Sequence, residues 1–278
     1  MRVGLIGTGN IGYPLFQNFL RQQLKVNILM DPRKVLKFPR CLLFKPEQVN
    51  DFINKSDIIF SVLPESSITS QIVEQITHPP QKKKYWVDLC CSCPHDINLI
   101  NNNLQNLGIE YMDAPISGCP LEMAQGKVST VISGPITCYQ KIYDIISAYN
   151  RNIFYISEKV GTATSVKIAN NTLVAANIIS VAEVLSILYK NNIDIDEALH
   201  FINNSSGKSL VSTDKFPRYI LNNKYDSNLP FKTHKKDILA FLKKENLNNS
   251  FFLKTLESIY RNLDEQFQDH TEIVKIVK

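Results

Sequence analysis

The sequence predicts two domains of different class: an α/β domain built on a doubly wound, largely parallel sheet, and then an all-α domain. Three observations predict this arrangement. Short apolar runs alternate with helical stretches over the first half, an apolar segment at helical spacing starts near residue 161, and only helical patterns follow it. We therefore expect one domain over residues 1–160 and a second over residues 161–278, joined by a long helix.

Seven runs rich in β-branched and aromatic residues are the predicted strands of the first domain. They are Val3–Ile6, Val26–Met30, Ile58–Leu63, Tyr85–Leu89, Tyr111–Ala114, Val128–Ile132 and Asn152–Ile156. Their alternation with helical stretches predicts βα units around a parallel sheet. The long helix is predicted over residues 162–190, and later helices are separated by breaks at residues 203–207, 222–230 and 246–250.

Length and composition exclude several classes of protein. A chain of 278 residues with 44% apolar and 21% charged residues is neither disordered nor membrane-spanning by composition. The N-terminal apolar run Val3–Gly7 is too short for a signal peptide. The net charge of +5 comes from dispersed lysines without interleaved aromatic residues, so a nucleic acid is not the expected partner. We expect a soluble, cytoplasmic protein with neither a nucleic-acid nor a membrane partner.

The cysteines do not predict a metal site. Cys90, Cys91 and Cys93 crowd together and His95 follows, but no second ligand cluster lies at a suitable spacing. Reduced thiols that behave as small apolar residues are the simpler interpretation.

A glycine-rich loop directly follows the first predicted strand and opens a helix. It spans Gly7–Gly12 and reads GTGNIG. Gly7 permits the tight turn, Gly9 lets the backbone approach a pyrophosphate, and Gly12 allows close packing of the helix. The N–H groups of the helix N-terminus favour phosphate, and Asn10 and Ile11 complete the predicted phosphate-binding residues. Strand, loop and helix together predict a Rossmann-type dinucleotide-binding domain.

Asp31 ends the second predicted strand, 19 residues after Gly12. Its carboxylate can accept hydrogen bonds from the adenosine ribose and would repel a 2′-phosphate, so NAD is the predicted cofactor. Arg33 could instead pair with a 2′-phosphate, which keeps NADP as the alternative.

Four further segments, in this order, resemble the β-hydroxyacid dehydrogenase family, which includes 3-hydroxyisobutyrate dehydrogenase and tartronate semialdehyde reductase. They are DIIFSVLP (57–64), DLCCSCP (88–94), DAPISGCPLEMAQG (113–126) and GTATSVKIANN (161–171). The first resembles the family strand that ends in a Leu-Pro beside the cofactor, here Leu63-Pro64. The second has the spacing D-x-S-T-x-x-P, with Cys90 and Cys91 in place of serine and threonine, and the resemblance places Cys91 at the cofactor.

The last two segments resemble the substrate-binding and catalytic motifs of the family. The third resembles D-A-P-x-S-G-G, with Cys119 in place of the second glycine, and the fourth resembles G-x-G-x-x-x-K-x-x-x-N, with Ala163 in place of a glycine. A later segment, FKTHKKDI (231–238), resembles the family's K-D motif and implies that Lys236 contacts nicotinamide and substrate.

The resemblance implies an NAD(P)-dependent oxidoreductase that transfers a hydride between nicotinamide and a small β-hydroxy acid or its semialdehyde. Lys167 is the implied general acid/base and Asn171 orients the substrate. Ser117 and the backbone N–H groups of Gly118 and Cys119 hold the anionic substrate by its carboxylate. Because a side chain at Cys119 narrows this turn, the substrate itself is not carried over from the family.

The spacing of Lys167 and Asn171 is compatible with this role. They are four residues apart on the predicted long helix and therefore share one face. On spacing alone, a lysine extending from a helix into solvent fits equally well. The apolar neighbours, including Val166 and Ile168, predict a largely buried helix, where a lysine calls for a functional reason. A lysine exchanges a proton near neutral pH when burial and neighbours lower its pKa from about 10.4.

Two alternatives stay open. One is an imine or keto-acid reductase on the same scaffold, which Lys167 argues against. The other is a catalytically inactive protein that binds nucleotide as a scaffold, which the cysteine substitutions leave possible. The histidines His95, His200 and His270 are expected at helix starts or polar faces and do not compete for the role of base. The apolar long helix predicts a homodimer or homotetramer.

Overall fold

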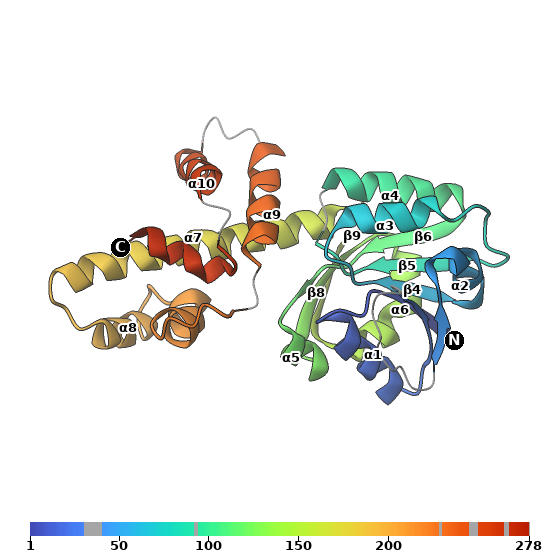
Figure 1. Ribbon diagram of the computed structural model, residues 1–278, viewed down its shortest axis with the longest axis horizontal. Coiled ribbons are helices and arrows are strands. Elements are labelled where there is room, and N and C mark those ends of the chain that lie inside the picture. Colours follow the sequence, from blue (N-terminus) through green and yellow to red (C-terminus); the bar gives the residue numbers. More distant parts are fainter. Residues whose placement is uncertain (31–40, 92–93, 228–229, 245–249, 264–266, 278) are drawn as a thin grey trace. The chain divides into compact units, whose positions relative to one another are not determined.

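The computed structural model describes residues 1–30, 41–91, 94–227, 230–244, 250–263 and 267–277, which form two compact units (Figure 1). Unit 1 comprises Met1–Lys167 and unit 2 comprises Ile168–Lys278. The division falls inside the long helix, a few residues beyond the boundary expected at residues 160/161.

Unit 1 is built on a mixed sheet that has nine strands within the described ranges. They are β1 (Arg2–Ile6), β2 (Lys25–Leu29), β3 (Cys41–Phe44), β4 (Ile58–Ser61), β5 (Lys84–Asp88), β6 (Ile109–Asp113), β7 (Ile116–Ser117), β8 (Val128–Ser133) and β9 (Asn150–Ser157). Their order is β3-β2-β1-β4-β5-β6-β8-β7, with β9 paired to β8. All pairs from β3 through β6 are parallel, β8 is antiparallel to β6 and β7, and β9 is parallel to β8. The predicted Rossmann-type sheet is confirmed.

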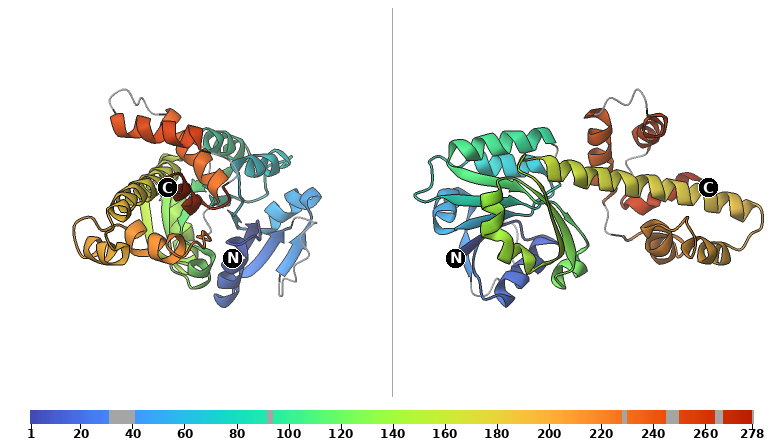
Figure 2. Two further views of the ribbon diagram at one scale, coloured as in Figure 1. Left: turned by 60° about the vertical axis from the view of Figure 1, so that its left-hand side comes forward. Right: turned by 180° about the vertical axis from the view of Figure 1, so that it is seen from behind.

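Helices cover both faces of this sheet. They are α1 (Gly12–Arg21), the short 3₁₀ helix η1 (Pro46–Gln48), α2 (Val49–Lys55), α3 (Ser66–Glu74), α4 (Pro94–Asn106), α5 (Pro120–Ala124) and α6 (Ile136–Ser147). Helices α3 and α4 lie together on one face, whereas α1 and α6 lie on the other (Figures 1 and 2).

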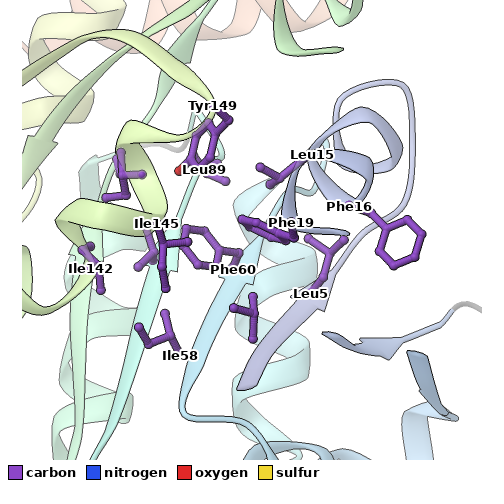
Figure 3. Packing of buried hydrophobic residues seen from close by; sticks show 14 of the residues in the cluster. Leu5, Leu15, Phe16, Phe19, Ile58, Phe60, Leu89, Ile142, Ile145 and Tyr149 are labelled. Carbon is purple, nitrogen blue, oxygen red and sulfur yellow. The ribbon is translucent and has the colours of Figure 1, made fainter. Parts of the chain in front are cut away.

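Alternating side chains of the strands fill a separate core on each face. Ile6, Ile59 and Trp86 belong to the core under α2, α3 and α4. Phe60 belongs to the opposite core, shown in Figure 3, where its ring lies 5.1 Å from that of Phe19 on α1. The central strands β1, β4 and β5 are therefore packed on both faces, which makes this part of the sheet a rigid support for the segments at its edge.

The order of the strands reverses direction at β1 and β4. From β1 the chain proceeds outward to β2 and β3, and then returns to β4 on the other side of β1. In such sheets ligands bind at the carboxyl ends of the strands, next to this switch point. The segments that follow β1, β4, β5 and β6 meet at that edge.

Unit 2 is helical in the part of the chain that the structure describes, apart from an isolated bridge between Pro230 and Asp269. Its helices are the continuation of α7 (Thr162–Lys190), α8 (Ile195–Asn203), the π-helical segment η2 (Val211–Ile220), α9 (Phe231–Lys244), α10 (Phe251–Asn262) and the 3₁₀ segment η4 (His270–Val277). The predicted all-α domain is confirmed. Its core contains Ala175, Ile178 and Leu185 of α7 together with side chains from every other helix of the unit.

Helix α7 has the predicted bounds, but it is less buried than the largely buried helix that the sequence predicted. Val166 is 47% exposed and Leu173 is 65% exposed. Within the described residues, α7 alone is long and apolar enough to cross a membrane, with a mean hydropathy of 1.8 and 39% of its most apolar window buried. A core helix passes the same test, and Ala175, Ile178 and Leu185 of α7 do lie in the core of unit 2.

His270 is the first residue of η4, which agrees with an expected helix start, but it does not lie on a polar face. Its side chain is fully buried, its ring stacks on His234 at 4.9 Å, and its Nε2 shares a hydrogen bond with the Tyr260 hydroxyl. Burial, followed by the positive potentials of His234 and Lys215, holds the pKa of His270 well below its usual value. His270 is therefore a neutral core residue of unit 2.

Candidate active site

The glycine-rich loop packs tightly against the segment that follows β4. Gly7 has a φ of +93°, and a Cβ there would lie 2.2 Å from the Val62 carbonyl oxygen. A Cβ on Gly12 would lie 2.0 Å from the Gly7 carbonyl oxygen. The fold itself thus requires glycine at these two positions.

Gly9 differs from its neighbours in this loop. No heavy atom of the described residues lies within 4 Å of the position that a Cβ on Gly9 would take, so packing among those residues does not explain the glycine. Gly9 and Asn10 are exposed, Ile11 is half-buried, and α1 starts without a side-chain cap. An open backbone cradle at the N-terminus of a helix fits a pyrophosphate. Asp31 and Arg33, which bear on the choice between NAD and NADP, lie outside the described residues.

The ends of β4 and β5 are joined through Cys90. The Leu63 N–H donates a hydrogen bond to Cys90 Sγ at 3.1 Å, and the Cys90 N–H donates to Asp88 Oδ1 at 3.1 Å. Burial, and then the charge of Asp88, raises the pKa of the Cys90 thiol, so this cysteine is not a reactive thiolate. It instead fixes the backbone that leads to Pro64, which is exposed, and to Cys91, which is half-buried.

The predicted substrate turn connects β7 to α5. Ser117 and Gly118 are exposed, and Gly118 has a φ of +150° that brings it against Val128, whose Cγ1 would lie 2.7 Å from an added Cβ. The side chain of Cys119 accepts a hydrogen bond from the backbone of Glu122, and the Glu122 carboxylate accepts the Cys119 N–H at 2.8 Å. Sequence reasoning missed Glu122, although the spacing of an N-cap residue and a glutamate three positions later is the signal of a capping box.

Helix α5 is also tied to the helix that follows the glycine-rich loop. Asn18 Nδ2 donates to the Met123 carbonyl oxygen at 2.6 Å, and an Arg21 guanidinium nitrogen donates to the Ala124 carbonyl oxygen at 2.7 Å. Both acceptors belong to the C-terminal end of α5. Hydrogen bonds therefore connect α1, which follows the cofactor loop, to α5, which follows the substrate turn.

The first turn of α7, which carries Lys167, is fixed to the carboxyl end of β6 by Asp113. The Asp113 carboxylate accepts the N–H groups of Gly161 and Thr164, both at 2.9 Å, and the Ser133 hydroxyl. Burial raises the pKa of Asp113, while these donors act in the opposite direction. Lys167 follows Thr164 by three residues and is half-buried.

The two remaining predicted residues belong to unit 2. Asn171 lies one turn after Lys167 on α7 and is 5% exposed. Lys236 lies on α9 and is exposed, next to the buried Asp237. The structure thus places the cofactor loop, the substrate turn and Lys167 in unit 1, and Asn171 and Lys236 in unit 2.

Two family models together match almost the whole chain. The NAD binding domain of 6-phosphogluconate dehydrogenase matches residues 2–157, and the NAD-binding region of NADP-dependent 3-hydroxyisobutyrate dehydrogenase matches residues 161–278. The chain belongs to the β-hydroxyacid dehydrogenase family. This β-hydroxyacid dehydrogenase takes a nicotinamide cofactor, as predicted.

Individual proteins that are similar to this chain support its assignment to the family. It is 24% identical to 2-(hydroxymethyl)glutarate dehydrogenase of Eubacterium barkeri, over 86% of this chain and 80% of that relative. It is 27% identical to the mitochondrial 3-hydroxyisobutyrate dehydrogenase of Rattus norvegicus, over 74% of this chain and 62% of the rat protein. Its fold matches that of 3-hydroxyisobutyrate dehydrogenase of Mycobacterium tuberculosis, solved with L-serine, with a TM-score of 0.84, 14% identity and coverage of 100% and 99% of the two chains.

Proposed function

We propose that this protein transfers a hydride between nicotinamide and a small β-hydroxy acid or its semialdehyde, with Lys167 as the general acid/base. One observation carries the proposal: the open cradle at Gly9 lies at the carboxyl edge of the same sheet to which Asp113 fixes the helix start that bears Lys167. The names of the relatives, which are dehydrogenases of hydroxy acids, support this substrate class.

Different residues are proposed to bind the substrate, to orient it and to transfer the proton. Ser117 and the backbone N–H of Gly118 hold the substrate carboxylate, the predicted Cys119 N–H being bonded to Glu122 in this structure, and Asn171 orients the substrate. In the oxidation, Lys167 in its neutral amine form accepts the hydroxyl proton as the hydride leaves the same carbon; in the reduction it returns that proton. The bound nicotinamide supplies the hydride acceptor or donor. Lys236 is proposed to contact both nicotinamide and substrate.

The cofactor preference, the assembly and the location of the protein are further parts of this proposal. NAD is preferred over NADP because Asp31 would repel a 2′-phosphate. A homodimer or homotetramer accounts for the exposed apolar side chains of α7, such as Leu173 and Ile187. A cytoplasmic location follows from the composition alone.

An imine reductase is the alternative enzyme on this scaffold. That of Myxococcus stipitatus, solved with NAD⁺, has a TM-score of 0.68 and 18% identity to this chain, which shows a shared fold only. Lys167 favours the hydroxy-acid reaction, because that reaction must move a proton on and off a hydroxyl group.

A panel of short hydroxy acids, semialdehydes and imines, each assayed with NAD(H) and NADP(H), tests the proposal. We expect turnover of at least one β-hydroxy acid, followed by the absorbance of reduced nicotinamide, with the higher kcat/KM for NAD. Cofactor binding without any turnover would support the inactive scaffold, and turnover of imines alone would support the imine reductase. Equal or better efficiency with NADP would contradict the role of Asp31.

A further inference from the structure

The turn that is proposed to bind the substrate carboxylate already holds a carboxylate of the chain itself. Glu122 Oε2 accepts the Cys119 N–H at 2.8 Å and would lie 3.1 Å from a Cβ on Gly118. Ser117, Gly118 and Glu122 are all exposed, so this negative charge is on the open side of the turn.

This contact changes what the turn can bind. The Cys119 N–H is one of the donors assigned to the substrate, and Glu122 occupies it. A second carboxylate arriving at Gly118 therefore has one donor fewer and a like charge beside it, which disfavours its binding. A hydrogen-bond donor on the carbon next to the substrate carboxylate could pair with Glu122 and offset this cost.

Glu122 is not the only group that fixes α5. Asn18 and Arg21 bind the carbonyl groups at the other end of this helix, and Cys119 Sγ accepts a backbone N–H at its start. The turn is therefore expected to keep its conformation when the charge of Glu122 is removed. An effect of Glu122 on substrate choice can be separated from an effect on folding.

We propose that Glu122 is a specificity-determining residue that selects β-hydroxy acids carrying a hydroxyl or ammonium group on the carbon next to the carboxylate. The inference rests on the proposed function, because it takes the turn as the site of the substrate carboxylate. The backbone N–H groups of the turn bind any carboxylate, whereas the Glu122 carboxylate distinguishes substrates by the group on the neighbouring carbon.

Three acids that differ only at this carbon test the inference: 3-hydroxypropionate carries hydrogen there, glycerate a hydroxyl and serine an ammonium group. Their dissociation constants are measured by calorimetry on the NADH-bound protein, which cannot oxidise them, and kcat and KM for oxidation are measured alongside with NAD. Glu122→Gln removes the charge but keeps an acceptor for the cap. Glu122→Ala also frees the Cys119 N–H, and Asp144→Asn removes an exposed carboxylate on α6 as the matched control.

We expect the unmodified protein to bind glycerate or serine roughly tenfold more tightly than 3-hydroxypropionate, the worth of one hydrogen bond to a charged group. Glu122→Gln and Glu122→Ala should bring the constants together, chiefly by tightening 3-hydroxypropionate, whereas Asp144→Asn should keep the difference. Equal binding of the three acids, or a difference that survives in both Glu122 variants, overturns the inference.

The two proposals fail separately in this experiment. Selective binding without turnover contradicts the proposed reaction and supports the role of Glu122. Turnover without selectivity supports the reaction and overturns the role of Glu122. Acids that bind neither the unmodified protein nor the variants overturn both.

Discussion

Lys167 lies three residues after Thr164, on a helix start whose backbone N–H groups are bonded to Asp113. We expect Lys167→Ala to lower kcat by about 10²–10⁴-fold, because the acid/base is lost. The affinity for NAD, measured by fluorescence titration, should stay unchanged. Lys167→Arg should restore little, since a guanidinium stays protonated at any accessible pH.

The control for this prediction is Lys190→Ala, at the exposed far end of the same helix. It should keep full activity and the same melting temperature as the parent. A well-folded Lys167→Ala protein that retains most of its turnover would refute the mechanism and reduce the family resemblance to one of fold.

Gly9 and Gly12 should respond differently to the same small substitution. Gly9→Ala meets no atom within 4 Å, so we expect the free energy of unfolding to change by less than about 0.5 kcal/mol. The NAD dissociation constant should nevertheless rise, because the methyl group stands where the pyrophosphate approaches. Gly12→Ala would place its Cβ 2.0 Å from a backbone oxygen and should lower the free energy of unfolding by about 1–3 kcal/mol. Denaturant titrations measure the free energy of unfolding of both variants, and a binding titration measures their affinity for NAD. An unchanged NAD affinity in Gly9→Ala would contradict the role of Gly9 in binding the pyrophosphate.

At the scale of elements, the attachment of α7 to the sheet depends on one carboxylate. Asp113→Ala removes the acceptor of the buried Thr164 N–H and of the part-buried Gly161 N–H, so we expect the free energy of unfolding to fall by about 3 kcal/mol. Asp113→Asn keeps one acceptor oxygen and should lower the free energy of unfolding by less than Asp113→Ala does. Hydrogen exchange of the amides at residues 161–167 should quicken in both variants. Unchanged exchange there would show that packing alone holds the helix start.

The helices around His270 should make unit 2 sensitive to acid. The pKa of His270 is lowered in the folded protein, so the unfolded chain takes up a proton first as the pH falls. The stability that depends on neutral His270 is fully present above the unfolded pKa of about 6.5 and is lost as the pH falls toward the folded pKa. We expect a loss of at most about 2 kcal/mol between pH 7 and pH 5.

Denaturant titrations at several pH values measure this loss. His270→Phe should flatten the pH dependence, and His200→Gln, which changes an exposed histidine, should not. An equal slope in the parent and in His270→Phe would assign the effect to other groups.

The sequence patterns predicted those features that depend on local periodicity. Helix α7 and the succession of βα units repeat their signal over many residues, and the glycine-rich loop has a fixed spacing. Strands β3 and β7 were missed because four residues at a sheet edge and a two-residue pair are too short for alternation to be seen. The burial of His270 depends on Tyr260 and His234, and the contact of Glu122 belongs to a capping box that opens on a cysteine. Neither appears in a periodic pattern.

At the scale of the whole molecule, the exposed apolar face of α7 should decide the assembly. Leu173, Val184 and Ile187 share one face of α7 and are 65%, 49% and 60% exposed in the single chain, which is unfavourable in water. We expect light scattering to give the mass of a dimer or tetramer. Ile187→Glu should shift the population toward the monomer, whereas Phe154→Glu, at an exposed apolar position on β9, should not. A monomeric parent at micromolar concentration would contradict the predicted assembly.

The hydrogen bonds from Asn18 and Arg21 to α5 connect the predicted nucleotide site to the predicted substrate turn. Helix α1 begins at the pyrophosphate cradle and, through these two side chains, bonds to the carbonyl groups of α5 behind the substrate turn. A nucleotide that stabilises α1 is therefore expected to stabilise the substrate turn as well. The affinity for nucleotide and the affinity for substrate are then linked reciprocally. Bound nucleotide is therefore expected to tighten the binding of substrate, and bound substrate to tighten the binding of nucleotide by the same factor.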